Sequence, residues 1–187
     1  VTDLGFSCIK HFVIFNEPDG IWASTNGDYE LWKNVLFRFH EKMKTYPGLL
    51  EKVSFAGPDV VVNYKNPVSP YDAEGWVKQT VSDVDSLIGI YDIHAYPGQG
   101  QVRAGEYKEI LAKYKRHIPK GKKILLGEAG YKYWNPADSI LGAEYRHRVE
   151  NHPFTKGSDC NMFVYDYFYG LDMPLLAMEV MNSGYAG

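Results

Sequence analysis

Cysteine is scarce in this sequence: 187 residues contain only Cys8 and Cys160. Two cysteines are too few for a disulfide framework, and their spacing is not that of a metal site. No apolar run approaches the roughly 18 to 20 residues that a membrane-spanning helix needs. The formal net charge of −3 shows no excess of one sign. We therefore expect neither nucleic acid nor a membrane as a partner.

Several catalytic motifs are also missing. No Gly-x-Ser-x-Gly nucleophile motif is present. The only glycine-rich turn, Gly98-Gln99-Gly100, follows His-Ala-Tyr-Pro instead of opening a helix directly, so it is a weak candidate for a phosphate cradle. Five histidines show no ligand spacing, and we expect no metal and no cofactor. They are His11, His40, His117, His147 and His152. No signal peptide is visible, but the first residue is not Met, so this absence carries little information.

Aromatic residues, by contrast, are abundant. They make up 15% of the chain, with 15 Tyr, 9 Phe and 4 Trp. This share favours a site built from ring faces, although large cores also use aromatics. The length favours a single domain, and the 45% hydrophobic and 23% charged shares are typical of a soluble globular protein.

Apolar runs and helical patterns alternate along the chain, which predicts an α/β fold. The predicted strands are 10–16, 52–56, 89–95 and 123–127. The predicted helices are 28–46, 73–84, 105–117 and 158–181, with a kink or restart at Pro174. Gly57-Pro58 is expected to stop the second strand, and 59–72 to form a loop. Near-continuous apolar strands imply parallel pairing with helices outside, either as an open doubly wound sheet or as a (β/α)8 barrel.

Polar residues gather where the predicted strands end. The first strand ends in Asn16-Glu17, the third runs into His94 and Tyr96, and Glu128 follows the fourth. In a barrel, these ends converge on one mouth, where catalytic groups lie. Either glutamate alone is more simply explained as a salt-bridge or capping residue. Together they form a pair suited to cleaving a glycosidic bond.

These segments resemble a known family. "FNEP", "DIHAYP" and "ILLGEAG" are similar to the fourth, sixth and seventh strands of the clan A glycoside hydrolases, which are (β/α)8 retaining enzymes. The glycine-proline after "VSFA" is similar to the fifth-strand segment of family 39 members, of the β-xylosidase and α-iduronidase type. The resemblance extends from about residue 10 to the C-terminus.

The resemblance implies a reaction and a role for each residue. The chain would be a retaining O-glycoside hydrolase that cleaves an oligo- or polysaccharide by double displacement. Glu17 would be the acid/base and Glu128 the nucleophile, Asn16 would bind the sugar 2-hydroxyl, and His94 and Tyr96 would orient the carboxylates. A retaining mechanism predicts carboxyl groups about 5–5.5 Å apart. We expect the full-length parent to be secreted or periplasmic.

Other residues are weaker candidates for substrate contacts. Trp22 follows the predicted strand that ends at Glu17, and Trp134 follows the one that ends at Glu128. Each either stacks on a sugar or packs against residues of its own loop. Tyr131 and Tyr133 lie near Glu128, and either could face the substrate. Two acidic residues have a structural alternative. Asp92 is a partner of the site or a layer-filling polar residue, and Asp19 caps the turn after Pro18.

The resemblance covers only part of a barrel. A complete barrel needs roughly 250 residues. The first three strands have no counterpart here, and the tail "SGYAG" resembles the start of the eighth. We therefore expect residues 1–187 to form a single partial (β/α)8 catalytic domain, roughly the second half. Open barrel edges favour self-association, and we expect this piece alone to be poorly stable and weakly active.

Two other functions stay open. A truncated barrel could be a catalytically impaired carbohydrate-binding fragment, which keeps a recognition surface without turnover. An unrelated α/β enzyme, such as a phosphate-binding barrel, is disfavoured by the lack of a glycine-rich cradle. The sugar is not identified by these residues: xylosides, glucosides and larger polysaccharides all fit.

Overall fold

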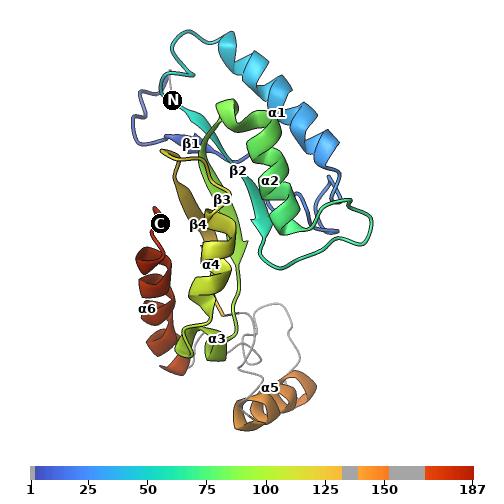
Figure 1. The fold of residues 1–187 in the computed structure, drawn as a ribbon, viewed down its shortest axis with the longest axis vertical. Coiled ribbons are helices and arrows are strands. Elements are labelled where there is room, and N and C mark those ends of the chain that lie inside the picture. The colour runs from blue at the N-terminus through green and yellow to red at the C-terminus, as the bar shows by residue number, and fades with distance from the viewer. Residues whose placement is uncertain (1–2, 132–138, 152–166) are drawn as a thin grey trace. The chain divides into compact units, whose positions relative to one another are not determined.

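The computed structural model describes residues 3–131, 139–151 and 167–187 (Figure 1). The chain divides into two compact units. The first consists of Val1–Ala95, Lys113–Glu128 and Tyr185–Gly187. The second consists of Tyr96–Ala112 and Ala129–Gly184. The prediction of a single domain stays a prediction.

A sheet of four parallel strands forms the centre of the first unit (Figure 1). The strands follow the chain order β1-β2-β3-β4. They are β1 (His11–Phe12), β2 (Ser54–Val61), β3 (Ile88–Ala95) and β4 (Ile124–Ala129). The sheet is curled and consistent with part of an α/β barrel, so the predicted α/β class is confirmed at that level.

The helices lie between and after these strands. They are α1 (Tyr29–Lys44), α2 (Ala73–Val84), the 3-10 turn η1 (Asp85–Leu87), α3 (Gln99–Arg103), α4 (Tyr107–Lys115), α5 (Ser139–Asn151) and α6 (Tyr167–Asn182). No helix in the described part of the chain is long and apolar enough to span a membrane.

The main core of the first unit lies where α1 and α2 pack on β2. Trp32 of α1 and Trp76 of α2 are both buried, and their rings lie 5.8 Å apart in a T-shaped arrangement. Gly57 of β2 lets the strand approach this pair, because a Cβ there would lie 3.3 Å from the Trp32 ring. Both helices begin at an aspartate whose carboxylate accepts a backbone N–H, Asp28 for α1 and Asp72 for α2.

The structure agrees with most of the helix predictions. The helices expected over 28–46 and 73–84 are α1 and α2, and the helix expected over 105–117 is the shorter α4. Helix α3 was not predicted. In the segment expected to be helical over 158–181, α6 contains Pro174 within one continuous helix. Of the predicted kink or restart at Pro174, the restart is therefore wrong and the kink stays a prediction. Residues 158–166 lie outside the described residues.

The predicted buried strand over 10–16 is wrong in both extent and burial. Only His11 and Phe12 form β1, and both are exposed. The strand pairs with β2 on one side, and the following residues leave the ladder. The N–H of Glu17 accordingly donates to a side chain, the carboxylate of Asp59, at 3.2 Å. Glu17 therefore lies in a loop beyond β1 and not at the last residue of a strand.

The predicted end of the second strand is also wrong. Strand β2 continues through Gly57-Pro58, a cis peptide bond, to Val61. Because proline has no N–H for the ladder, pairing with β3 is irregular, with a register shift between Pro58 and Val60. Residues 59–61, predicted as loop, thus belong to the strand. This continuation brings Asp59 to the site described below.

The C-terminal tail lies along the outer edge of β4. The N–H of Leu126 donates to the carbonyl of Gly187, and the N–H of Ala186 donates to the carbonyl of Ile124. These are bonds of the kind that join neighbouring strands. The tail therefore begins a strand-like pairing, as the sequence predicted for this segment.

Candidate active site

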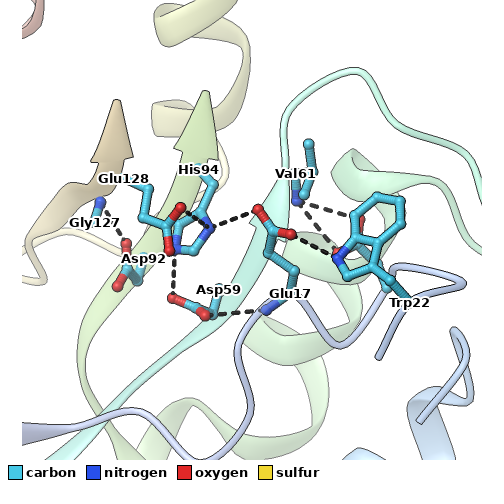
Figure 2. Close-up of polar contacts among 9 residues, drawn as sticks. Glu17, Trp22, Asp59, Val61, Asp92, His94, Gly127 and Glu128 are labelled. Atoms are coloured by element: carbon cyan, nitrogen blue, oxygen red, sulfur yellow. Dashed lines mark hydrogen bonds and ion pairs between the residues drawn. The ribbon is translucent and has the colours of Figure 1, made fainter. Parts of the chain in front are cut away.

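His94, near the end of β3, is the centre of a cluster of carboxylates (Figure 2). Its Nδ1 lies 3.0 Å from Glu17 Oε1 and 3.8 Å from Glu128 Oε2. Its Nε2 lies 3.0 Å from Asp59 Oδ1. The imidazole thus uses one nitrogen for the two predicted catalytic glutamates and the other for a buried aspartate.

These contacts determine the charge of His94. Burial opposes the charged form, but the hydrogen bonds to Asp59 and Glu17 outweigh it and raise the pKa of His94 to about 9. At neutral pH the ring therefore carries a proton on each nitrogen. His94 donates one hydrogen bond to Asp59 and one to Glu17, and its positive charge lies beside Glu128.

Asp59 is a site residue that the sequence did not reveal. It is only 3% exposed, and it accepts hydrogen bonds from both His94 and the backbone N–H of Glu17. The sequence predicts a loop at this position, because Gly57-Pro58 is expected to stop the strand. The signal that was available is an acidic residue close after an apolar strand, separated from it by Gly57-Pro58. The same reasoning identified Glu17 and Glu128.

Asp92 connects the ends of β3 and β4. Its Oδ1 accepts the N–H of Gly127 at 2.8 Å, which fixes the backbone next to Glu128. A Cβ at Gly127 would lie 2.5 Å from the Asp92 carboxylate, so this contact needs a glycine. Burial and the neighbouring Asp59 carboxylate raise the pKa of Asp92 well above its usual range. Both roles left open by the sequence, a partner of the site and a layer-filling polar residue, are compatible with these contacts and stay predictions.

The second oxygen of Glu17 is also engaged. Trp22 Nε1–H donates to Glu17 Oε2 at 2.6 Å (Figure 2). The backbone of Glu17 has φ +48°, and that of Asp59 has φ +65°, in the left-handed region that non-glycine residues seldom adopt. The other non-glycine residues with positive φ in the described chain are two asparagines, which tolerate this region well. Aspartate shares this tolerance, so Glu17 is the unusual case, and such backbone geometry is found most often at functional sites.

The loop that carries Glu17 and Trp22 is held firmly. Asp19, predicted to cap the turn after Pro18, is only 2% exposed, and its carboxylate accepts the N–H of Val61 in β2. Burial, with Glu17 nearby, raises the pKa of Asp19 to about 7. Thr25 Oγ1 donates to the carbonyl of Pro18 at 2.6 Å. These bonds fix the backbone on which the Glu17 side chain depends.

The structure brings the two predicted catalytic glutamates together. One carboxylate oxygen of Glu17 and one of Glu128 lie within 4.8 Å of each other, with His94 Nδ1 as close to both. The two side chains differ in access to solvent: Glu128 is 44% exposed and Glu17 is 13% exposed. The arrangement offers one open carboxylate for attack and one sheltered carboxylate for proton transfer.

The other predicted substrate-binding residues lie in different places. Asn16 is exposed and precedes Glu17. Tyr96 belongs to the second unit, just past β3, so its predicted contact with Glu128 stays a prediction. Tyr131 also belongs to the second unit. It is buried there, with its hydroxyl donating to the carbonyl of Asp172 at 2.9 Å. Trp134, like Tyr133, lies outside the described residues.

Among the residues that the structure describes, two overlapping groups of side chains are compact enough to hold a cation. They are Glu17, His94 and Glu128, and Asp59, Asp92 and His94, and within each group the ligand atoms lie within 4.8 Å of one another. Both groups need His94 as a neutral ligand, whereas its carboxylate partners favour the imidazolium. The expectation of no metal stays a prediction.

Comparison with known proteins gives no further identification: no protein-family model matches the sequence, and no curated protein does.

Proposed function

We propose that this protein is a retaining O-glycoside hydrolase of the clan A type, built on part of a (β/α)8 barrel. The observation that carries the proposal is the close approach of Glu17 and Glu128, with carboxylate oxygens within 4.8 Å of each other. Retaining enzymes hold their carboxyl groups about 5–5.5 Å apart, and inverting enzymes about 6.5–9.5 Å apart. Nearest oxygens within 4.8 Å of each other suit the retaining separation, which leaves no room for a water between nucleophile and sugar.

The first half of the reaction requires an ionised nucleophile and a protonated acid. In our proposal a Glu128 oxygen attacks the anomeric carbon while the bond to the leaving oxygen breaks. Glu17 gives its proton to that oxygen. The product is a glycosyl ester on Glu128 and a free leaving-group alcohol. The more exposed position of Glu128 suits attack on a substrate that arrives from solvent.

The second half reverses the role of Glu17. A water attacks the anomeric carbon, Glu17 takes the proton of that water, and the ester bond to Glu128 breaks. The anomeric configuration of the substrate is thereby restored. In both halves His94 remains a cation, holds Glu17 in place, and stabilises negative charge on Glu128 when the nucleophile is free.

A second candidate is a sugar-binding protein with impaired catalysis. The observation in its favour is that both oxygens of Glu17 accept hydrogen bonds, from His94 and Trp22. A carboxylate that only accepts hydrogen bonds is not ready to donate a proton. Such a protein would bind oligosaccharides without hydrolysing them.

The proposal extends to location and substrate size. An enzyme for oligo- or polysaccharides must meet polymers that do not cross membranes readily. We therefore propose that this protein is secreted or periplasmic.

Kinetics of two glutamine variants test the assignment. The hydrolysis of a panel of aryl glycosides is measured for the wild-type protein. It is then measured for the Glu17→Gln and Glu128→Gln variants. Glu128→Gln should abolish turnover of every substrate. Glu17→Gln should reduce kcat/KM by about 10²–10⁴-fold for poor leaving groups, and little for activated aryl groups that leave without a proton. Glu51→Gln, at an exposed glutamate outside the site, is the matched control.

Azide rescue then separates the two roles. With Glu128→Ala, azide takes the place of the missing nucleophile and gives a glycosyl azide of inverted configuration. With Glu17→Ala, azide attacks the glycosyl ester and gives a retained product. Full turnover by Glu128→Gln would contradict the nucleophile assignment. Saturable sugar binding by a wild-type protein that hydrolyses nothing would favour the second candidate.

A further inference from the structure

We propose that Trp22 is a latch on Glu17, and that the leaving-group sugar opens it when it binds against Trp22 and Tyr64. This inference rests on the proposed function and deepens it, because it assigns a leaving-group subsite and a control of proton transfer. The hydrogen bond from Trp22 Nε1–H to Glu17 Oε2 is called the indole latch below. All three residues belong to the first unit.

The indole latch occupies Oε2 of Glu17, a carboxylate oxygen that could carry the proton in the acid step. Glu17 Oε1 accepts from the His94 imidazolium, and Oε2 accepts from the indole N–H at 2.6 Å. Hydrogen bonds to the ionised form of a carboxylate favour that form. The closed latch thus suits Glu17 as a base, and the acid step requires the indole N–H to leave Oε2.

The Trp22 ring is free to leave because little protein covers it. The residue is 54% exposed, although its nitrogen contacts a Glu17 side chain that is only 13% exposed. The loop backbone, by contrast, is fixed by the bonds of Asp19 and Thr25. Opening the latch therefore needs a rotation of one side chain and no movement of the loop.

The ring also has a defined seat. Trp22 packs against Tyr64, with ring centroids 4.9 Å apart and ring planes inclined by 53°. A Cβ on Gly20 would collide with the indole, so the ring lies close over the backbone at that glycine. These two inclined rings, called the corner below, lie beside Glu17 because Trp22 bonds to its carboxylate. A pyranose ring, with apolar C–H faces and polar edges, fits such a corner.

The occupant is the sugar on the leaving side of the scissile bond. The corner adjoins the acid/base, which must reach the leaving oxygen, so a sugar seated there carries that oxygen. The hydroxyl groups of this sugar can replace the indole N–H as the hydrogen-bond partners of Glu17. The substrate class is thus an oligosaccharide with at least one sugar beyond the cleaved bond.

The pH dependence of a Trp22→Phe variant tests the latch. Phenylalanine keeps an aromatic ring but has no N–H. The profile of kcat/KM reports the free enzyme, in which the latch is closed, whereas the profile of kcat reports the substrate complex, in which the sugar has opened it. For an oligosaccharide substrate, the variant should move the alkaline limb of kcat/KM upward by about one pH unit. It should leave the alkaline limb of kcat unchanged.

Three further variants separate the latch from other effects. Tyr64→Ala removes one wall of the corner and should raise KM for oligosaccharides but not for aryl glycosides. Tyr64→Phe keeps the ring and should move neither limb. Ile21→Ala, at an exposed neighbour in the same loop, is the matched control and should behave like the wild type.

The possible failures are distinguishable. If the wild-type protein has no turnover, the proposed function is contradicted and the latch with it. If the wild type is active and Trp22→Phe moves neither limb, the hydrogen bond has no role in proton transfer and only the latch is contradicted. If both limbs move together, the bond persists in the substrate complex, and opening by the sugar is contradicted.

Discussion

At the scale of single residues, the two site glutamates depend on His94, because its Nδ1 lies beside both of them. A neutral imidazole would offer a hydrogen bond to only one carboxylate at a time. The cation persists because Asp59, itself buried, binds the other nitrogen. The carboxylate of Asp59 thus acts on the glutamates through a histidine, as a positioning residue.

The first prediction concerns the titration of His94. Its pKa of about 9 lies above the ordinary value of 6.5, so its ion pairs stabilise the fold below pH 6.5. This stabilisation is lost as the pH rises through about 9. Asp59→Asn removes one carboxylate and should lower the pKa of His94 by about 1–2 units, measured by NMR of the imidazole nitrogens. Asp28→Asn, which keeps a helix cap far from His94, is the control.

At the scale of secondary-structure elements, buried carboxyl groups join a loop to a strand, and Asp19 is one of them. Asp19 accepts the N–H of Val61 and so attaches the loop that carries Glu17 to β2. The loop would otherwise follow an exposed strand of two residues, β1, which offers little support. The position of Glu17 therefore depends in part on this contact.

The second prediction concerns Asp19 and pH. Its pKa is raised from 3.8 to about 7, so its contribution to stability is complete below pH 3.8 and lost as the pH rises through about 7. Asp19→Asn keeps an oxygen acceptor for Val61 and cannot ionise. The unfolding free energy of the wild type should fall by roughly 2–4 kcal/mol more than that of the variant between pH 4 and 8. Urea unfolding at several pH values measures this difference, and parallel curves would contradict it.

Much of this level of structure could be predicted from the sequence. The helix over 73–84 has a capping aspartate and a regular apolar face, and its bounds agree with those of α2. The strand β3 was predicted to within one residue because β-branched and aromatic residues are frequent in it. The convergence of Glu17 and Glu128 followed from the rule that parallel strands end at the same side of a sheet.

Other features depend on contacts that the sequence does not display. In the sequence, Gly57-Pro58 indicates the end of a strand. In the structure β2 continues past Pro58, which has no N–H, and its pairing with β3 shifts register there. Asp59 was missed for that reason. The short β1 was overestimated because an apolar run indicates burial only where another element covers it. The bond from Trp22 to Glu17 depends on a loop conformation that no local pattern specifies.

At the scale of the whole molecule, an apolar surface lies around the exposed edge strand. In the described sheet β1 is a terminal strand, paired only with β2. Leu4 is 76% exposed, Phe6 50%, Ile9 41% and Phe12 43%. Unpaired backbone groups next to apolar side chains favour association with another chain.

The third prediction is that the chain self-associates through this edge. Light scattering coupled to size-exclusion chromatography should show a mass that rises with protein concentration. Phe6→Lys should reduce this association, because a charge on an edge strand or its flank opposes pairing. Leu31→Lys, at an exposed apolar residue on α1, is the control and should not change it. A constant monomer mass at every concentration would contradict the prediction.

The stereochemistry of hydrolysis tests the central claim, that Glu17 and Glu128 are a retaining pair, most directly. The wild-type protein is mixed with an aryl glycoside that it hydrolyses, and the anomeric proton of the first product is followed by NMR before mutarotation. The account predicts that this product has the anomeric configuration of the substrate. A first product of the opposite configuration, or no hydrolysis of any glycoside, would contradict it.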